Sequence, residues 1–315
     1  MKIILAFFKL IRWPNLVFII ITQLLFYFCV YAPMLSSNLF PHISLLYLLI
    51  AASVCIAAAG YIINDYFDIQ IDAINKPERV VVNKIIKRRW AIVWHWVLSS
   101  IGIFFSFFVS YKLHVWSIFI VNVLCVISLW FYSTTFKKKL LIGNVCIALL
   151  TAWVIVEIYL FVGANIFSFS NFEKLDDTFN VRRFFKFTML YVGFSFVSTL
   201  IREVVKDLED MEGDRKYDCK TMPITWGVPA SKVFIAVWIL VAVAALFVIQ
   251  LYAWLSGWWF VALYILVLIL IPFVFLLVKL VKAYSISHYN LLSGIVKLIM
   301  LSGILSMLIL KFVTY

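Results

Sequence analysis

The chain has few charged residues for its length. Only 13% of its 315 residues are Asp, Glu, Lys or Arg, whereas a soluble domain carries about a quarter. Instead, 65% of the residues are hydrophobic and 18% are aromatic. A soluble core cannot bury this much apolar surface, so we expect much of it to face lipid. The sequence contains no low-complexity linker and no sign of a separate soluble domain, which predicts one membrane domain over residues 1–315.

The sequence also lacks the patterns of a structural metal or disulfide scaffold. Its five cysteines form no CxxC pair, and four of them fall inside apolar runs. Its four histidines are scattered, without the spacing of metal ligands. These absences argue against a zinc site and a disulfide framework.

Apolar runs close to the ~20 residues needed to cross a bilayer recur along the chain. They predict an all-α integral membrane protein with nine transmembrane helices. The expected spans are residues 14–34, 43–64, 90–110, 114–134, 140–163, 184–203, 231–254, 257–279 and 291–312.

The positive charges predict an orientation for these spans. The formal net charge is +12, which in a soluble protein would indicate nucleic acid. Here Lys and Arg flank apolar spans and favour anionic headgroups, so we expect no nucleic acid partner. With the N-terminus inside, the inner segments hold most of the cations, and an odd number of spans puts the C-terminus outside. The outer segments then hold only Lys112, Lys174, Arg182, Arg183, Lys186 and Lys311.

Acidic residues gather in two places at the predicted inner ends of the second and sixth spans. The first cluster, residues 64–72, reads NDYFDIQID, and the second, residues 206–214, reads KDLEDMEGD. Both contain D-x-x-D-x-x-x-D, a spacing that predicts three carboxylates on one face of a helix. We call these the first and second aspartate boxes, and their match indicates a weak internal duplication.

Like charges one turn apart repel, unless divalent cations lie between them. Oxygen ligands suit Mg²⁺, which usually binds one or two carboxylates together with substrate phosphates. Each box is also accompanied by Lys and Arg, which bind phosphate oxygens. These cations are Lys76 and Arg79 after the first box, and Arg202, Lys206, Arg215 and Lys220 around the second. The alternative is a solvated charged helix end, which explains one box better than two. The two boxes therefore predict a Mg²⁺–diphosphate site at the rim of a central cavity.

That chemistry suits the transfer of a prenyl group. An allylic diphosphate ionises when its leaving group is stabilised, and the carbocation needs an apolar pocket that excludes water. A membrane protein with a metal site at its cytoplasmic rim meets both needs. We therefore expect an isoprenyl diphosphate donor, a lipophilic acceptor and surrounding membrane lipid as partners.

The same residues resemble the UbiA superfamily of intramembrane prenyltransferases over nearly the whole chain. The boxes carry most of the resemblance, and R-W-P-N at 12–15 and Y-S-T-T-F-K at 132–137 resemble flanking elements of the family. The resemblance implies nine helices around a central cavity that opens sideways to lipid. It also implies Mg²⁺ ligands at Asp65, Asp68, Asp72, Asp207, Asp210 and Asp214.

The resemblance assigns further residues to the substrates. Tyr132 would lie near the reacting centre, and Asn64 would support the first box. Phosphate contacts would come from Arg79, Lys137, Lys206 and Lys220. Arg12 and Asn15 would border the substrate cavity.

Within the family, R-E-V-V-K-D-L-E-D at 202–210 most resembles digeranylgeranylglyceryl phosphate synthases. This implies transfer of a geranylgeranyl group to the hydroxyl of geranylgeranylglyceryl phosphate, which forms an ether lipid. The continuation of the first box, K-P-E-R-V at 76–80, departs from the R-P-x-R-P of relatives. An aromatic acceptor, as in quinone biosynthesis, therefore stays open.

A membrane transporter is the alternative from another class. Glu157 and Lys297 lie within apolar spans, where ionisable residues are functional candidates. The binding groups of transporters lie more often near mid-membrane on broken helices, whereas the carboxylates here lie at span ends.

Overall fold

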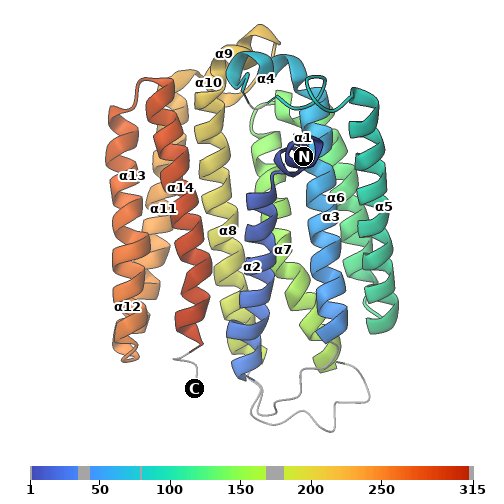
Figure 1. Ribbon diagram of the computed structural model, residues 1–315. Helices are drawn as coiled ribbons and strands as arrows, with labels where there is room; N and C mark the ends of the chain where they lie inside the picture. Colours follow the sequence, from blue (N-terminus) through green and yellow to red (C-terminus); the bar gives the residue numbers. More distant parts are fainter. Residues whose placement is uncertain (1, 35–42, 79, 168–180, 312–315) are drawn as a thin grey trace. The chain divides into compact units, whose positions relative to one another are not determined.

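The computed structural model describes residues 2–34, 43–78, 80–167 and 181–311. Throughout these ranges the chain is helical, apart from connections and one isolated bridge between Val82 and Ile86. Figure 1 shows the long helices running side by side within each part of the chain, with short helices at their ends. The predicted all-α class is confirmed.

Nine helical segments of the described chain are long and apolar enough to cross a membrane. Each matches one predicted span, with ends shifted by up to six residues. The nine segments are Trp13–Met34, Ile43–Phe67, Arg88–Leu113, Trp116–Thr134, Ile142–Gly163, Val181–Glu209, Gly227–Leu255, Trp259–Lys282 and Ile286–Leu310.

Two of these spans are not regular α-helices throughout. The first span is α2 (Trp13–Leu25) followed by a π-helical segment, Phe26–Tyr31, and a short 3₁₀ turn, Ala32–Met34. The eighth span is α12 (Trp259–Ile265), a π-helical segment, Leu266–Leu270, and α13 (Ile271–Lys282). Pro272 lies in the first turn of α13 and has no backbone N–H to continue the α-helical pattern, which explains the wider turn before it.

The other elements are the long single helices and several short connecting helices. The long ones are α3 (Ile43–Phe67), α5 (Arg88–Leu113), α6 (Trp116–Thr134), α7 (Ile142–Phe167), α8 (Val181–Glu209), α11 (Gly227–Leu255) and α14 (Ile286–Leu310). The short ones are α1 (Lys2–Leu10), α4 (Ile69–Asn75), η3 (Phe136–Lys138), α9 (Met211–Lys216) and α10 (Met222–Thr225).

The chain divides into two compact units. Unit 1 holds α1, α2 up to residue 24, α3 to α6 and the second part of α7, from residue 154. Unit 2 holds residues 25–34, the first part of α7, up to residue 153, and α8 to α14. One aspartate box lies in each unit.

Small residues set the packing of α3 against α5 in unit 1. A Cβ added to Gly102 of α5 would lie 2.7 Å from Ile56 Cγ1 and 3.1 Å from the carbonyl oxygen of Ala52, both on α3. Helices in lipid associate through such close contacts rather than through a hydrophobic driving force. The approach fixes α3, which carries the first box at its end.

Unit 2 has a similar contact between α8 and α14. A Cβ at Gly303 would lie 2.1 Å from the ring of Phe194. Around this contact, α8, α11, α13 and α14 bury a continuous apolar cluster that includes Val204, Phe273 and Val296. This cluster holds α8, which carries the second box at its end.

Candidate functional site

The first box lies where α3 ends and α4 begins. Asp65 belongs to α3, whereas Asp68 stands between the helices with φ −92° and ψ 2°, and Asp72 belongs to α4. The backbone keeps helix-type hydrogen bonds on both sides, from Asp68 N–H to Asn64 O at 3.0 Å and from Asp72 N–H to Asp68 O at 2.8 Å. The first box is therefore a joint between two helices.

The second box has the same local structure. Its middle residue, Asp210, separates α8 from α9 with φ −97° and ψ 6°, and Asp214 N–H bonds to Asp210 O at 3.2 Å. The prediction of three carboxylates on one continuous helix needs correction in both boxes. Three like charges one turn apart disfavour an unbroken helix, and aspartate is a poor residue for a helix interior.

Two cations of unit 1 contact the carboxylates of the first box. Arg12 Nη2 donates to Asp65 Oδ1 at 2.7 Å, and the Lys137 ammonium group donates to Asp68 Oδ1. Asp68 is only 5% exposed, so its ion pair lies largely away from water. Sequence analysis expected Arg12 and Lys137 at the substrate, and the structure brings both to the box.

The position of Arg12 depends on a left-handed backbone. Its φ is +51°, a conformation that costs an ordinary residue roughly 1–2 kcal/mol. This residue joins α1 to α2, and its guanidinium group also lies 5.2 Å from the ring centroid of Tyr61. Strain of this kind persists where the surroundings fix it, and it is common at functional sites.

Asp72 is a carboxylate of the first box that lies outside the membrane spans, and its pKa is strongly shifted. Burial, together with the charges of Asp68 and Asp65, raises its pKa to about 7, although Arg12 and Lys137 oppose the shift. A divalent cation beside these oxygens would favour the ionised form. The raised pKa therefore reflects the burial of this carboxylate first and its negatively charged neighbours second.

In the second box, Asp207 is oriented by a residue outside the box. Asn144, near the start of α7, donates from Nδ2 to Asp207 Oδ2 at 2.8 Å, and Asn144 is 8% exposed. The chain turns into α7 through Leu141, whose φ is +58°. Asn144 thus fixes one carboxylate while leaving its other oxygen for a different partner.

Three charged side chains of α8 form a cluster that reaches from the turn before the second box to its first residue, Lys206. Arg202 Nη1 lies 2.9 Å and Lys206 Nζ lies 2.7 Å from the same atom, Glu203 Oε1. We call these residues the α8 charge cluster. Lys206 was predicted as a phosphate contact and Arg202 as one of the cations that accompany the second box, whereas Glu203 was not among the predicted site residues.

The other predicted site residues differ in how deeply they are buried. Asn64 has a buried Oδ1 that accepts no hydrogen bond from the described residues. Asn15 and Tyr132 are half-buried, on α2 and α6, and Lys220 is exposed beyond α9. Arg79 lies outside the described residues.

The oxygen-only donors of the boxes fit Mg²⁺ chemically. No three His, Cys, Asp or Glu side chains of the described chain converge as a ready-made metal site. Mg²⁺ is usually bound through one or two carboxylates plus substrate phosphates rather than in an all-protein cage. Asp65, Asp68 and Asp72 in unit 1, and Asp207, Asp210 and Asp214 in unit 2, are the residues that would hold it.

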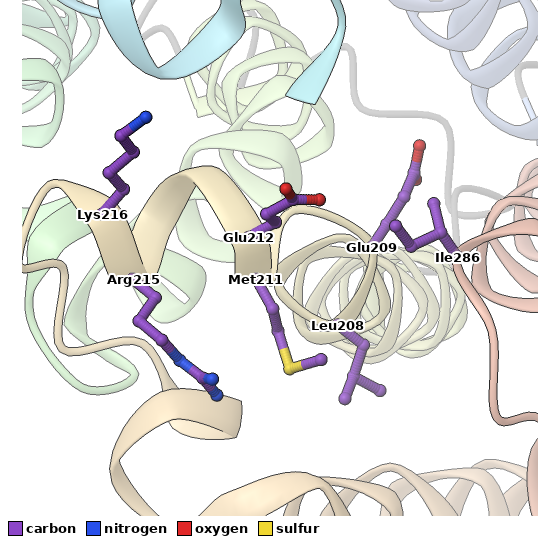
Figure 2. A pocket seen from close by; sticks show the side chains of 7 residues that line it. All are labelled: Leu208, Glu209, Met211, Glu212, Arg215, Lys216 and Ile286. Carbon is purple, nitrogen blue, oxygen red and sulfur yellow. The ribbon is translucent and has the colours of Figure 1, made fainter. Parts of the chain in front are cut away.

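A pocket of about 360 Å³ lies beside the second box in unit 2. Figure 2 shows its lining, in which Leu208 and Met211 offer apolar surface while Glu212 and Lys216 project away from them. Ile286, at the start of α14, closes one side. None of the three box aspartates lines this pocket, so it lies on another face of α8 and α9.

Unit 1 also contains a polar cluster within the spans, centred on Glu157 of α7. Its Oε2 accepts from Ser53 Oγ at 2.5 Å and Gln23 Nε2 at 3.2 Å, and its Oε1 accepts from Asn122 Nδ2 at 2.6 Å. Asn122 Nδ2 also lies 2.7 Å from Ser106 Oγ. The Glu157 cluster therefore links α2, α3, α5, α6 and α7, which indicates helix pairing rather than a pathway for ions.

Sequence reasoning missed Asn144 and Glu203 as parts of the site, whereas it counted Arg202 among the cations around the second box. Asn144 follows Gly143 after the three lysines at 137–139, and Glu203 stands four residues before Asp207 on α8. That spacing was a usable signal for Glu203. Nothing in the spacing alone pairs Asn144 with Asp207, because the two are 63 residues apart.

Curated relatives of the chain are archaeal proteins named digeranylgeranylglyceryl phosphate synthase. The protein of Methanosphaera stadtmanae is 32% identical over 184 residues, which cover 58% of each chain. That of Sulfurisphaera tokodaii is 34% identical over 223 residues, which cover 71% of this chain and 70% of the relative. The match thus spans less than two thirds of the Methanosphaera relative.

Solved structures share the fold over nearly the full length. A structure described as giving insight into digeranylgeranylglyceryl phosphate synthase in membranes has a TM-score of 0.61 at 23% identity, and covers 98% of this chain and 99% of its own. A UbiA homologue from Archaeoglobus fulgidus, bound to DMAPP and Mg²⁺, has a TM-score of 0.60 at 14% identity and covers 96% and 99%. At these identities the likeness concerns the fold.

A family model supplies the remaining comparison. The model of the UbiA prenyltransferase family matches residues 25–290, which include both aspartate boxes and seven of the nine spans in full. The chain belongs to the UbiA prenyltransferase family.

Proposed function

We propose that this protein is a Mg²⁺-dependent membrane prenyltransferase that makes an ether lipid. In the reaction, the allylic C–O bond of an isoprenyl diphosphate breaks and diphosphate leaves. A new C–O bond forms to the hydroxyl oxygen of a lipophilic acceptor, which loses its proton. The observation that carries the proposal is that both boxes have the same local structure. In each box the middle aspartate separates a long helix from a short one and has the same backbone conformation.

The residues of the two boxes have distinct tasks in this proposal. Mg²⁺, when bound, neutralises charge on the departing diphosphate. Arg12 and Lys137 bring positive charge to the first box, and they would bind phosphate oxygens once a cation takes their place at the carboxylates. Asn144 keeps Asp207 in one orientation.

Geranylgeranyl diphosphate and geranylgeranylglyceryl phosphate are the substrates we propose. Support comes from the R-E-V-V-K-D sequence at 202–207 and from relatives named digeranylgeranylglyceryl phosphate synthase. An aromatic acceptor is the second candidate, since the boxes concern only the donor.

A competition assay tests the acceptor. Purified protein in detergent with Mg²⁺ receives geranylgeranyl diphosphate together with geranylgeranylglyceryl phosphate, 4-hydroxybenzoate and 1,4-dihydroxy-2-naphthoate, and mass spectrometry identifies the products. We expect the doubly alkylated glyceryl phosphate to dominate. A prenylated aromatic would retain the prenyl transfer and reject the ether-lipid assignment. Absence of any product, in protein shown to be folded, would reopen the transporter alternative.

We propose the cell membrane as the location, with the N-terminus and both boxes on the cytoplasmic side and the C-terminus outside. The excess of Lys and Arg in the inner segments supports this orientation. The test is a Lys216→Cys variant of a chain without its native cysteines, treated with a membrane-impermeant maleimide. Lys216 is exposed on α9, so labelling should require permeabilised cells. Labelling of intact cells would reverse the orientation.

A further inference from the structure

The short helix α1 carries an exposed apolar face in unit 1. It has nine residues and a length of about 13 Å, far short of the roughly 30 Å hydrocarbon core of a bilayer. Ile4 is 61%, Leu5 is 63% and Phe8 is 48% exposed. Positions 4 and 8 are one turn apart with position 5 beside them, so these side chains form one apolar face. Contiguous apolar surface of this kind marks contact with a partner or a membrane.

The other face of α1 is packed against the rest of unit 1. Ala6 and Leu10 are buried in one apolar cluster with Ile86. The ring centroid of Phe7 lies 5.1 Å from that of Trp94 on α5. This packing fixes α1 on unit 1 and leaves the face of Ile4, Leu5 and Phe8 for a different neighbour.

The membrane interface is the neighbour that fits this face. Two residues, Ile11 and Arg12, join α1 to the span that begins at Trp13, so α1 lies where that span leaves the bilayer. Figure 1 shows α1 crossing the direction of α2 and α3. Trp13 and Trp90 are exposed beside it, and tryptophan is enriched at the level of the headgroups. An amphipathic helix in this place lies along the interface with its apolar face inserted.

The surroundings of α1 are strongly basic. Residues 1–13 and 78–94 contain eight Lys and Arg residues and a single acidic residue, Glu78. Lys9 Nζ donates to the backbone carbonyl oxygen of Glu78 at 2.6 Å. The guanidinium group of Arg88 lies 4.4 Å from the ring centroid of Tyr66. Both partner groups are neutral and balance none of the positive charge, which favours lipids with anionic headgroups.

Arg12 connects α1 to the first aspartate box. Its backbone N–H bonds to Lys9 O at 3.1 Å, and its Nη2 donates to Asp65 Oδ1 at 2.7 Å. The left-handed φ of +51° at Arg12 sets the angle between α1 and α2. A membrane that holds α1 in place therefore also holds the Arg12 side chain at the box.

We propose that α1 is a docking surface for anionic membrane lipids and that the docked helix positions Arg12 at the first box. The face of Ile4, Leu5 and Phe8 inserts among the headgroups, and the cations around α1 bind their phosphates. The docking does not depend on the proposed reaction. The positioning of Arg12 rests on the proposed function and deepens it, because it makes the lipid surface part of the donor site.

A fluorescence experiment tests the docking without any reaction. Leu5→Cys, in a full-length chain without its native cysteines, carries a fluorophore in phosphatidylcholine vesicles that contain a minor fraction of phosphatidylglycerol. Two preparations have the same composition and differ only in which of the two lipids bears quenching bromine atoms. Ala73→Cys is the matched control, since this residue is exposed on α4 in the same unit.

We expect brominated lipid to quench the fluorophore at position 5 and to leave that at position 73 nearly unchanged. Per molecule of lipid, brominated phosphatidylglycerol should quench more strongly by about fivefold, the effect of one cation at a membrane surface. Lys87→Gln combined with Arg89→Gln should reduce this preference, since both side chains are exposed beside α1. Equal quenching by the two lipids would overturn the anionic assignment. A fluorophore at position 5 that neither brominated lipid nor aqueous iodide quenches would mean that protein covers α1, which also overturns it.

A double-mutant cycle tests the positioning of Arg12. Ile4→Gln combined with Leu5→Gln should lower prenyl transfer in the same vesicles by about tenfold, the scale of a lost charge-assisted hydrogen bond. In an Arg12→Gln background the same pair should have almost no further effect, because both changes act through one group. Ile4→Leu combined with Leu5→Ile keeps the face apolar and should match wild type. Thermal melting checks that each variant is folded, and losses that multiply in the cycle would reject the positioning role.

The two measurements separate this inference from the proposed function. If wild type transfers no prenyl group, the proposed function is wrong and the positioning of Arg12 falls with it, whereas the quenching still decides the docking. If wild type is active but the fluorophore at position 5 is quenched no more than that at position 73, the docking is wrong and the proposed function stands.

Discussion

Asp210→Asn is expected to lower turnover by roughly 10²–10³-fold, the usual cost of removing one group that stabilises developing charge. The change keeps the shape of the side chain and removes the negative charge that Mg²⁺ requires. Asp68→Asn should have an effect of similar size in the first box. The measurement is product formation at saturating Mg²⁺, by mass spectrometry, with folding verified by size-exclusion chromatography.

Asp218→Asn supplies the matched control for Asp210→Asn. Asp218 follows α9, is exposed and lies outside the box spacing. Its φ of +55° is one that asparagine tolerates well, so the variant should fold and turn over like wild type. Turnover by Asp210→Asn close to that of wild type would reject the role of the second box. Asp68→Asn also removes the charge partner of Lys137.

Glu157→Ala is expected to cause the largest loss of stability. The substitution removes the acceptor for Ser53, Asn122 and Gln23, all buried. Hydrogen bonds between transmembrane helices contribute about 0.6–2 kcal/mol each, so the total loss should be roughly 2–5 kcal/mol. The measurement is the thermal melting of the protein in detergent, compared with wild type.

Glu157→Gln should retain most of the stability. Ser53 Oγ has one hydrogen, yet it lies 2.5 Å from Glu157 Oε2 and 3.2 Å from the carbonyl oxygen of Leu49. An amide at position 157 can donate to Ser53 Oγ, accept from Asn122 and leave the serine hydrogen for Leu49, and it gives up only the 3.2 Å hydrogen bond from Gln23 Nε2. A melting temperature of Glu157→Gln as low as that of Glu157→Ala would show that the negative charge itself is needed.

The spans were predictable from sequence because their cause is local. About 20 apolar residues must form a helix in lipid, where every backbone polar group needs an internal partner. The π-helical segment before Pro272 depends on the same local chemistry, although hydropathy alone does not reveal it. The short helices α4 and α9 were missed because the carboxylate spacing fits a continuous helix as well as a broken one.

The sequence predicted which residue types form the site, but it predicted few of the contacts between them. The spacing of the boxes identified the carboxylates, and the resemblance identified Arg12 and Lys137, which the structure places on Asp65 and Asp68. Asn144 and Asp207 meet only through the packing of α7 and α8, which no sequence pattern encodes. Glu157 was noticed as an ionisable residue within a span, but its neighbours come from four other helices and become evident only in three dimensions.

The break at the middle aspartate divides each box into two intervals that lie on different helices. The three-residue interval before Asp68 or Asp210 is measured along a membrane-spanning helix, and the four-residue interval after it is measured along a short helix with its own axis. A residue inserted into α3 or α8 just before the break would rotate the first aspartate of the box by about 100° relative to the other two. One inserted inside α4 or α9, ahead of the last aspartate, would displace that carboxylate alone. The two intervals can thus change independently, so an insertion in α4 or α9 would move the last aspartate of a box and keep the first two in register.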